Sequence, residues 1–576
     1  MLGRRAGPAL SHSLSTLLSL HPTLPSSPSS SSSSASKGHV HPIWSTLPGD
    51  VLTPIAAYLR LTNGAQEDVE SFLLESAVKG ETAGRWSFMG ANPSKVYRTG
   101  PKETTAGDPL VPLEQKLNEY KFLKVQGAPP LTGGAIGYVG YDCVHYFEPK
   151  TARSDLSDPV GIPESVFLLH DTVVAFDHLF QRVYVVGHVY LPFPSSSSSS
   201  SSSSCSTPSL EVTESITQSY ATASRSIAQT AQILQSTSPL PLPSQPTFSA
   251  STTKAEAVSN VGKEGYEGFV TSLKASIVQG EIIQAVPSQR LRRETKVAPF
   301  NIYRQLRQLN PSPYMFYIQC GNGVQLVGAS PECLCKVEAE EDEDEDEAGA
   351  RVENHAIAGT VRRGKDAKED ASLAAELRAS VKDRAEHVML VDLARNDINR
   401  VCRPDSVVVD SLMQVEKFSH VMHLTSQVSG RLRAGLTRFD AFRSIFPAGT
   451  VSGAPKIRAI ELIASLEQER RGAYAGAVGW WALGEGGGCD TCIAIRTMVV
   501  KTLQTPQLGE GRGQGEGEGE GWEVFLQAGG GIVFDSVEED EYVETINKLG
   551  ANVRCLEVAE AYYAEQQEDG EEGAEQ

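Results

Sequence analysis

A chain of 576 residues with 40% apolar side chains is long enough to bury more than one core and has the composition of an ordinary globular protein. Its net charge of −20 is concentrated in acidic runs at residues 338–347, 510–521 and 565–576, so the rest of the chain is close to neutral and offers no basic surface for a nucleic acid. No apolar run is long enough to cross a bilayer, which argues against a membrane protein.

The nine cysteines are scattered, and only 333/335 and 489/492 are close pairs, with no second pair at the spacing of a zinc site. We therefore expect reduced thiols that serve as packing residues in a cytosol-like compartment. The first 38 residues are rich in serine and proline and contain no acid, which is typical of an organelle transit peptide, but they carry few cations. A cytoplasmic protein is the first expectation, and an organelle protein is the alternative.

Composition and patterning divide the chain into five segments. We predict a disordered Ser/Pro-rich extension (1–47), an N-terminal domain (48–192), a low-complexity linker (193–261), a second domain (262–552) and an acidic tail (553–576). Apolar runs at 135–141, 172–176 and 183–188 predict buried strands, and the linker contains a helical pattern at 213–235. The acidic insertion near 338–350 and the Gly/Glu insertion at 505–521 each separate two strand-like segments, which predicts hairpins across them.

Residues 446–467, FPAGTVSGAPKIRAIELIASLE, combine a loop of small residues with an amphipathic helix. Pro455 suits a first helical position. The glycines leave backbone N–H groups at the helix start, and Lys456 adds a cation there, so the stretch suits an anionic ligand. A tight loop that caps a core helix is an equally good interpretation of this pattern.

Two pairs of carboxylates are spaced by three residues, Asp383 with Glu386 and Glu541 with Glu544. This spacing places each pair on one face of a helix. Such pairs usually lie on solvated helix faces, but four converging carboxylates would repel unless a hard cation such as Mg²⁺ lay between them.

Two further polar residues lie within apolar stretches. His423, in SHVMHL, has the pattern of a core histidine, although histidine is also the side chain best suited to proton transfer near neutral pH. Arg496, in IAIRT, follows a strand-like run, and a buried arginine needs an anion.

GTVSGAPK (449–456) resembles the signature of the chorismate-utilising enzymes, and within them of the anthranilate synthase component I family. Further matching pieces follow the order of that family: IIQAVPSQR (282–290), NPSPYMFY (310–317), GASPE (328–332), AIAGT (356–360), DRAEHVMLVDLARND (383–397), VMHL (421–424), DTCIAIRT (490–497), QAGGGIV (527–533) and EYVETINK (541–548). The resemblance covers most of residues 262–552 and, more weakly, about 48–190. It implies an α+β chain whose two parts build packed β-sheets flanked by helices.

The resemblance also implies site residues. Glu386, Glu544, Asp383 and Glu541 match the positions that hold Mg²⁺ directly or through water, and Asp383 stands where relatives carry Glu. The implied catalytic residues are His423, which faces the leaving hydroxyl of chorismate, Gln284 and Thr360. The implied substrate neighbours are Thr450, Tyr474, Arg496, Gly529, Gly530, Gly531 and Lys456.

Gln284 and Ala358 distinguish between the branches of the family. Relatives that add water to chorismate carry a lysine base at the position of Gln284, and a neutral amide cannot take a proton from water. Aminodeoxychorismate synthases carry a lysine nucleophile at the position of Ala358, which alanine cannot replace. The expected reaction is therefore amination of chorismate by ammonia to give anthranilate and pyruvate, the first committed step of tryptophan biosynthesis. The alternatives are an aminodeoxychorismate synthase component I and a non-catalytic partner that senses chorismate or tryptophan.

The chain contains no cysteine in a glycine-flanked nucleophile elbow, so we expect a separate glutaminase subunit (component II) to supply ammonia. On their residues alone, LLES (73–76) and NPSPYM (310–315) favour a helix cap and a turn, but they match the segments of the family that bind tryptophan as a feedback inhibitor. The implied residues are Glu75, Ser76, Pro313, Tyr314 and Met315.

Overall fold

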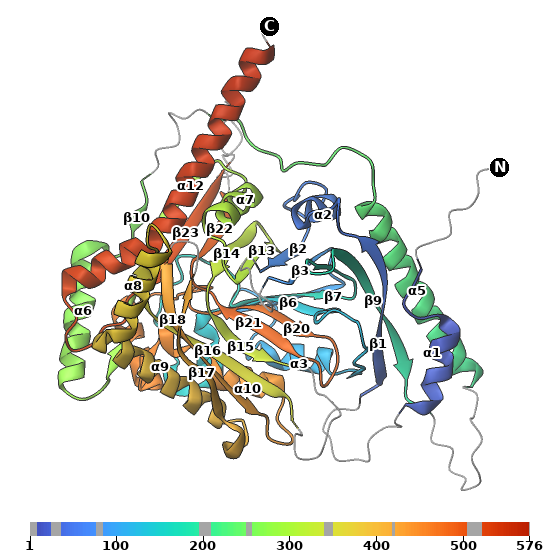
Figure 1. The fold of residues 1–576 in the computed structure, drawn as a ribbon, viewed down its shortest axis with the longest axis horizontal. Coiled ribbons are helices and arrows are strands. Elements are labelled where there is room, and N and C mark those ends of the chain that lie inside the picture. Colours follow the sequence, from blue (N-terminus) through green and yellow to red (C-terminus); the bar gives the residue numbers. More distant parts are fainter. Residues whose placement is uncertain are drawn as a thin grey trace.

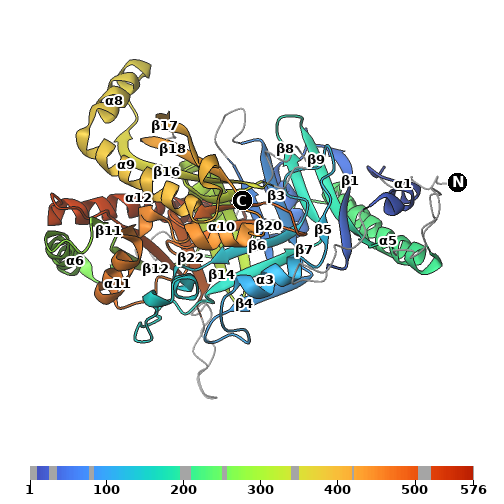
Figure 2. The same ribbon diagram turned by 90° about the horizontal axis from the view of Figure 1, so that it is seen from below.

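The computed structural model of the chain describes residues 9–24, 36–76, 84–194, 209–248, 256–338, 349–417, 421–503 and 521–574. Two large β-sheets form the centre of the molecule, and helices lie outside them (Figures 1 and 2). The longest strand pairs are antiparallel. The predicted α+β arrangement of packed sheets flanked by helices is confirmed.

The larger sheet has twelve strands. Their order across the sheet is β10 (Val258–Ser259), β12 (Ser288–Thr295), β23 (Trp522–Gly529), β22 (Thr497–Thr502), β14 (Val324–Ser330), β13 (Tyr314–Gly321), β2 (Ser71–Glu75), β3 (Trp86–Ala91), β8 (Val173–Asp177), β9 (Arg182–Pro192), β1 (Gly38–Pro48) and β5 (Lys121–Phe122).

The second sheet has nine strands, and a separate two-stranded sheet joins β11 (Gln284–Ala285) to β19 (Gly453–Ala454). The order of the nine is β17 (Val408–Lys417), β18 (Val421–Arg431), β16 (Arg351–Arg362), β15 (Cys333–Val337), β21 (Cys489–Ile493), β20 (Ala477–Ala482), β6 (Gly134–Val139), β7 (Ser165–His170) and β4 (Lys95–Thr99).

Both large sheets take strands from the two parts of the chain that we predicted as domains. In the larger sheet β2 pairs with β13, and in the smaller sheet β6 pairs with β20. Neither sheet is complete without residues from both 48–192 and 262–552, so the N-terminal part directly supports the elements that carry the catalytic motifs.

The two sheets pack face to face through an apolar layer. Phe72 and Phe316 of the larger sheet meet Ile136, Val166 and Val478 of the smaller one in this layer. Because helices cover the outer faces, strands such as β6 and β7 are buried at every residue, and their sequences are continuous apolar runs rather than alternating ones.

The helices cover the outer faces in two groups. Against the larger sheet lie α1 (Leu14–Leu20), α2 (Pro54–Leu61), α5 (Leu210–Leu234), α7 (Pro299–Leu309) and α12 (Glu538–Ala574), and against the smaller one lie α3 (Leu110–Leu117), α9 (Val381–Asn399) and α10 (Arg438–Ile445). Three more, α6 (Gly262–Val278), α8 (Ala367–Ala379) and α11 (Lys456–Glu467), gather with α9 and α12 at one side of the molecule, opposite α1 and α5 (Figures 1 and 2).

The prediction of disorder over residues 1–47 is wrong for part of this segment. Ser13 caps helix α1, and β1 pairs with β9 along eleven residues. The reason is that Val40, Ile43 and Leu47 are buried in the core, so this serine-rich region still contributes enough apolar surface to order a strand. Residues 1–8 and 25–35 lie outside the described residues.

The helix predicted at 213–235 is confirmed as α5, whose Ile216, Ala223 and Ile227 are buried. The serine run 195–204 lies outside the described residues. The acidic tail predicted from residue 553 is wrong at its start, because α12 continues into it and buries Cys555 and Leu556 together with Ala559, which lies four and three residues after them on the same helix face.

Both predicted hairpins are confirmed. Strand β15 pairs with β16 across the acidic insertion, and β22 pairs with β23 across the Gly/Glu insertion. The insertions themselves, at 339–348 and 504–520, lie outside the described residues. Residues 326–337, predicted as one arm of the first hairpin, are divided between two sheets, because β14 belongs to the larger sheet and β15 to the smaller.

Candidate active site

A bulge in the smaller sheet positions His423. Strands β16 and β18 pair Ala358 with Leu424 and Thr360 with His423, and the register shifts at Gly359, which has a positive φ of 66°. His423 Nδ1 lies 3.0 Å from the Gly359 carbonyl oxygen and 3.1 Å from Thr360 Oγ1. Because a carbonyl can only accept, Nδ1 carries the proton and Nε2 is the acceptor nitrogen of the neutral ring.

The charge state of His423 follows from its surroundings. The pKa of His423 is lowered to about 4, mainly by burial and to a lesser extent by the nearby cations Arg496 and Lys548, while the hydrogen bond to Gly359 opposes the shift. The ring is therefore neutral at pH 7, ready to accept a proton rather than to give one.

Helix α9 supplies the first carboxylate pair. Ser380 caps the helix by accepting a hydrogen bond from the Asp383 backbone N–H. A Cβ placed on Gly359 would lie 3.1 Å from Asp383 Oδ1, so the bulge and this carboxylate are neighbours. Burial raises the pKa of Glu386; the charges of Glu544 and Asp383 add to this rise, and Lys548 opposes it.

Helix α12 supplies the second pair. Glu541 Oε1 accepts a hydrogen bond of 2.7 Å from Ser536, while its Oε2 is buried without a hydrogen-bond partner. Lys548 Nζ lies 2.7 Å from Glu544 Oε1 and 2.8 Å from the Gly529 carbonyl oxygen. Burial, and then the charge of Glu544, raises the pKa of Glu541. The two helices thus bring the predicted metal ligands into electrostatic contact.

The oxygen atoms of these four carboxylates are of the type that binds a hard cation. The four side chains do not, however, converge on one point in this structure. In the part of the chain that the structure describes, no three His, Cys, Asp or Glu side chains converge as the ligands of one metal would. The unpartnered Oε2 of Glu541 could bind a cation directly or accept a hydrogen bond from a water molecule on the cation. Glu544, whose side chain is half exposed, would have to turn from Lys548 to join it.

The glycine loop, residues 529–531 at the end of β23, packs against the carboxylates of Glu386 and Glu541. Gln284 Nε2 lies 3.4 Å from Glu386 Oε1, and a Cβ on Gly531 would lie 2.4 Å from the same Nε2. A Cβ on Gly530 would lie 3.0 Å from Glu541 Oε2. The absence of side chains at these positions is what lets the backbone lie against the carboxylates.

Arg496 and Tyr474 complete this group. Arg496 has a left-handed φ of 52° and donates to the Lys548 carbonyl oxygen at 2.7 Å. The Tyr474 hydroxyl lies 3.2 Å from the Cβ position of Gly529. Burial lowers the pKa of Arg496 and raises that of Tyr474 to about 12, so both side chains are held in a desolvated environment that would favour an anionic ligand beside the guanidinium.

Lys456 lies elsewhere. Its ammonium is 2.6 Å from Asp397 Oδ2 and 3.0 Å from the Ile445 carbonyl oxygen. Asp397 lies eleven residues beyond Glu386 on α9, about 16 Å along the helix axis. The structure therefore places Lys456 in a buried ion pair rather than with the carboxylates.

Two residues of this region were not singled out from the sequence. Lys548 contacts Glu544 and the glycine loop. Glu332 is buried and lines a cavity of about 20 Å³ together with Thr450 and Leu390. Burial raises the pKa of Glu332 to about 8, with Lys548 opposing the shift. Both lie inside motifs of the resemblance, EYVETINK and GASPE, which is the signal that could have identified them.

The segments predicted to bind tryptophan lie side by side, because β2 pairs with β13 and places Glu75 opposite Met315. Both carboxylate oxygens of Glu75 are engaged, by Tyr303 at 2.7 Å and by Arg307 at 2.9 and 3.1 Å. Ser76 Oγ accepts from the Gly84 N–H at 3.0 Å, Pro313 precedes the strand, and the Tyr314 hydroxyl donates to Asp490.

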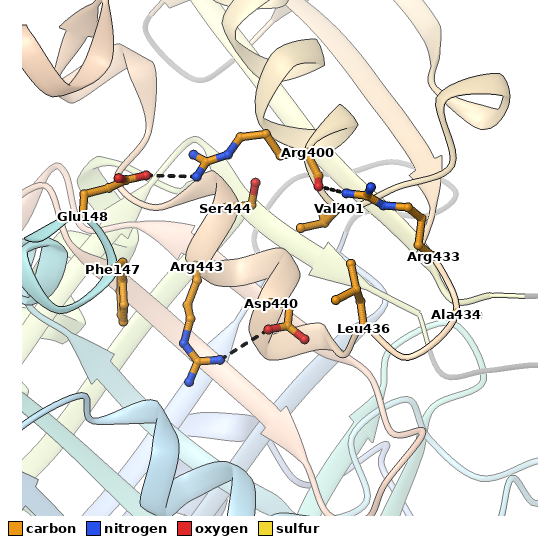
Figure 3. Close-up of a pocket in the computed structure, with 10 residues that line it drawn as sticks. All are labelled: Phe147, Glu148, Arg400, Val401, Arg433, Ala434, Leu436, Asp440, Arg443 and Ser444. Carbon is orange, nitrogen blue, oxygen red and sulfur yellow. Dashed lines mark hydrogen bonds and ion pairs between the residues drawn. The ribbon is translucent and has the colours of Figure 1, made fainter. Parts of the chain in front are cut away.

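A surface pocket of about 530 Å³ is separate from these groups (Figure 3). Three arginines line it, and each is already engaged: Arg400 with Glu148 at 3.0 Å, Arg443 with Asp108 at 3.1 Å, and Arg433 with the Arg400 carbonyl oxygen. Because these guanidinium groups already have partners, this pocket is a weaker candidate than the group around Glu386.

A family model described as "chorismate binding enzyme" matches residues 70–554. The chain belongs to this family. Two curated relatives show that it is a member of the anthranilate synthase component 1 branch: the protein of Saccharomyces cerevisiae named "Anthranilate synthase component 1" is 49% identical over 530 residues, 92% of this chain and 94% of that protein. "Probable anthranilate synthase component 1" of Schizosaccharomyces pombe is 49% identical over 531 residues, 92% of this chain and 96% of that protein.

Solved structures agree with this family. The crystal structure of anthranilate synthase component I from Streptococcus pneumoniae TIGR4 has a TM-score of 0.62 and 32% identity, covering 88% of this chain and 98% of that chain. The menaquinone-specific isochorismate synthase of Escherichia coli, at 18% identity and a TM-score of 0.59, shares the fold. The shared fold alone does not decide the reaction, so the residues of the site have to. In the described residues no helix is long and apolar enough to cross a membrane.

Proposed function

We propose that this chain converts chorismate and ammonia into anthranilate, pyruvate and water. The names of its component 1 relatives support this reaction, and the observation that carries the choice of nucleophile is the surroundings of Gln284. Its neutral amide lies against Glu386, at the position where water-adding relatives carry a lysine base. An amide supplies no base for water, whereas ammonia needs no such activation to act as a nucleophile.

Ala358 supports the same branch. It belongs to the apolar cluster that contains Leu390 and Val391 of α9, one turn beyond Glu386. A methyl group there offers no nucleophile to the substrate ring, which disfavours the aminodeoxychorismate branch.

The side chains divide the proton transfers between them. His423, neutral with Nε2 as the acceptor, takes up the proton that ammonia releases on adding to the ring, and Glu332, whose pKa is raised to about 8, gives its proton to the departing hydroxyl, which leaves as water. Arg496, desolvated and close to Tyr474, binds a carboxylate of the substrate. The glycines at 529–531 let the ring approach the backbone closely.

Mg²⁺ is the cofactor that the carboxylates suit best. Glu386 and Glu544 would hold it, with Asp383 and Glu541 contributing through water, and when bound it would neutralise the ring carboxylate and the charge that develops on the leaving oxygen. The closeness of Glu386 to Glu544 and Asp383, together with the unpartnered Oε2 of Glu541, supports this assignment.

A separate glutaminase would supply ammonia, as the numbering of the relatives as component 1 suggests.

Tryptophan would inhibit by binding where β2 and β13 adjoin. Because both parts of the chain contribute strands to both large sheets, a ligand at that site could influence the position of the carboxylates. A cytoplasmic location, or an organelle if the first residues are a transit peptide, fits the eight described cysteines, which form no disulfide.

The deciding experiment uses the purified full chain with chorismate, ammonium chloride and MgCl₂. We expect the fluorescence of anthranilate to appear, and to disappear when EDTA is added. An aminodeoxychorismate synthase would consume chorismate without that emission, and a sensor would bind chorismate without consuming it. Either result would overturn the proposal.

A further inference from the structure

The residues around the carboxylates come from segments far apart in the sequence, and one buried side chain connects these segments. Arg471 follows helix α11 and is 3% exposed. It lies three residues before Tyr474, one of the candidate substrate neighbours. Neither its charge nor its position has a role in the proton transfers described above.

The guanidinium of Arg471 holds the backbone of two other segments. Its Nη1 donates to the Val451 carbonyl oxygen at 2.8 Å, and its Nη2 donates to the Val286 carbonyl oxygen at 2.7 Å. Val451 follows Thr450, and Val286 lies two residues after Gln284. One planar group thus sets the distance between the segments that carry Thr450 and Gln284.

The partner of Arg471 extends this connection to the glycine loop. Glu467 accepts from Arg471 Nε at 2.9 Å and from Nη2 at 2.7 Å, and its Oε1 also accepts from the backbone N–H and the hydroxyl of Ser288, at 2.7 and 2.8 Å. Gln527, two residues before Gly529, donates to the same hydroxyl at 2.9 Å. The strand that leads into the glycine loop is therefore tied to the same ion pair.

The N-terminal part of the chain completes this arrangement. Asp142 accepts from the backbone N–H of Arg471 at 3.3 Å and from that of Gly472 at 2.8 Å. The Tyr141 ring lies 4.5 Å from the guanidinium carbon, and the Tyr474 ring lies 5.6 Å from it. The turn that presents Tyr474 is thus held by a carboxylate from residues 48–192.

We propose that Arg471 is a positioning residue for the substrate pocket, which sets the spacing of the segments bearing Gln284, Thr450, Tyr474 and the glycine loop, with Asp142 anchoring it to the N-terminal part. This inference rests on the proposed function in taking chorismate as the substrate. A lysine in place of Arg471 keeps the charge but offers a single ammonium, which cannot meet two carbonyl oxygens and both oxygens of Glu467 in the fork geometry of a guanidinium.

A buried ion pair with a purely structural role would also lower stability when changed, so a matched control is needed. Arg293 is a buried arginine of β12, 6% exposed, and its Nη2 lies 2.6 Å from Glu560 of α12. Glu560 lies sixteen residues beyond Glu544 on α12, about 24 Å along the axis. Arg293→Lys therefore perturbs a comparable ion pair away from the substrate segments.

The test compares wild type, Arg471→Lys and Arg293→Lys by thermal unfolding, by isothermal titration with chorismate and by steady-state kinetics. We expect both variants to unfold at a lower temperature, but only Arg471→Lys to weaken chorismate binding at least tenfold and to lower kcat. Chorismate affinity and kcat within twofold of wild type in Arg471→Lys would overturn the proposal, as would an equal loss in Arg293→Lys.

Asp142→Asn provides a milder variant in case Arg471→Lys does not fold. An amide retains one acceptor for the two backbone N–H groups, so we expect a rise in the KM for chorismate of about threefold with little change in kcat; an unchanged KM would contradict the anchoring role of Asp142. The titration separates the two proposals. If wild type binds chorismate but forms no anthranilate, the proposed reaction is wrong, and the loss of affinity in Arg471→Lys still decides the role of Arg471.

Discussion

Glu386 on α9 and Glu544 on α12 lie close enough for the charge of Glu544 to raise the pKa of Glu386. Burial is the larger cause of this shift, and Lys548, 2.7 Å from Glu544, opposes it. Two carboxylates that lie close together in a partly buried site repel each other unless a cation binds between or beside them. Lys548 supplies part of that positive charge, and a divalent ion would supply more.

Glu386→Gln removes one anion from this group and keeps its size. Because the substitution removes charge from the proposed metal site, we expect kcat/KM for chorismate to fall at least about 100-fold, or about 3 kcal/mol, and the Mg²⁺ concentration for half-maximal activity to rise. Steady-state kinetics at varied MgCl₂ would measure both. Asp392→Asn is the matched control on the same helix, since Asp392 is 76% exposed and pairs only weakly with Arg395. Unchanged Mg²⁺ dependence in Glu386→Gln would remove this residue from the metal site.

Gly531→Ala tests the contact between the glycine loop and Gln284. A Cβ there would lie 2.4 Å from Gln284 Nε2, and Gln284 is 2% exposed, so its amide would have to move against Glu386. Such overpacking costs about 1–3 kcal/mol, and we expect chorismate affinity to fall about tenfold with a modest loss of thermal stability.

Gly550→Ala is the control for this substitution. Apart from the adjoining backbone of α12 itself, nothing lies within 4 Å of the Cβ position of Gly550, which is in the interior of this helix. Alanine should therefore stabilise the protein by about 0.5–1 kcal/mol and leave the KM unchanged. If Gly531→Ala behaves like Gly550→Ala in calorimetry and titration, the close approach of the loop is not required for binding.

Local patterns predicted the elements that carry the site well. The three-residue spacing of Asp383 and Glu386 placed both carboxylates on what the structure shows as one helix, and the apolar run at 135–141 corresponds to strand β6. Both signals depend on neighbours in the sequence, which is where the 3.6-residue and two-residue periods act. Strand β1 escaped prediction because its partner, β9, is distant in the chain and the serine-rich composition around it resembles that of disordered segments.

Charge partners were harder to predict than elements. Lys456 follows a glycine-rich loop and suited a ligand, yet it pairs with Asp397 of α9. The helical stretch around Lys548 gave no sign of a role for this residue, yet Lys548 contacts Glu544 and the glycine loop. Which ions meet depends on how helices and loops pack, and no periodicity in the sequence encodes that.

Ser76→Leu tests the proposed tryptophan site. Ser76 adjoins the β2–β13 pair and accepts a hydrogen bond from Gly84, so a bulky apolar side chain would occupy space beside Met315. We expect the inhibition constant for tryptophan to rise at least about tenfold, within the usual range of coupling energies, while kcat without tryptophan stays the same. Ser94→Leu, at an exposed serine that bonds to the Leu169 carbonyl, is the control. Equal inhibition of the two variants would reject this site.

The neutral state of His423 predicts how stability depends on pH. Its pKa of about 4 in the folded protein lies below the value of roughly 6.5 in the unfolded chain, so between these values the unfolded state binds more protons. Folding is therefore favoured above pH 6.5, and the contribution of His423 is lost as the pH falls towards 4, by about 3 kcal/mol. Relative to His423→Gln, wild type should lose that much unfolding free energy in urea titrations between pH 7 and pH 4.

The comparison of wild type with the variant isolates His423 from other buried histidines. His41 and His170 have pKa values lowered to about 4 and about 3 by burial, and they shift stability in the same direction in both proteins, so their effects cancel in the difference. If the difference between His423→Gln and wild type stays constant from pH 7 to pH 4, the ring is not held neutral by burial and by its bond to Gly359. In that case the imidazole would titrate near pH 6.5 like an exposed histidine, and the tautomer with its proton on Nδ1 would share the neutral pH range with the imidazolium.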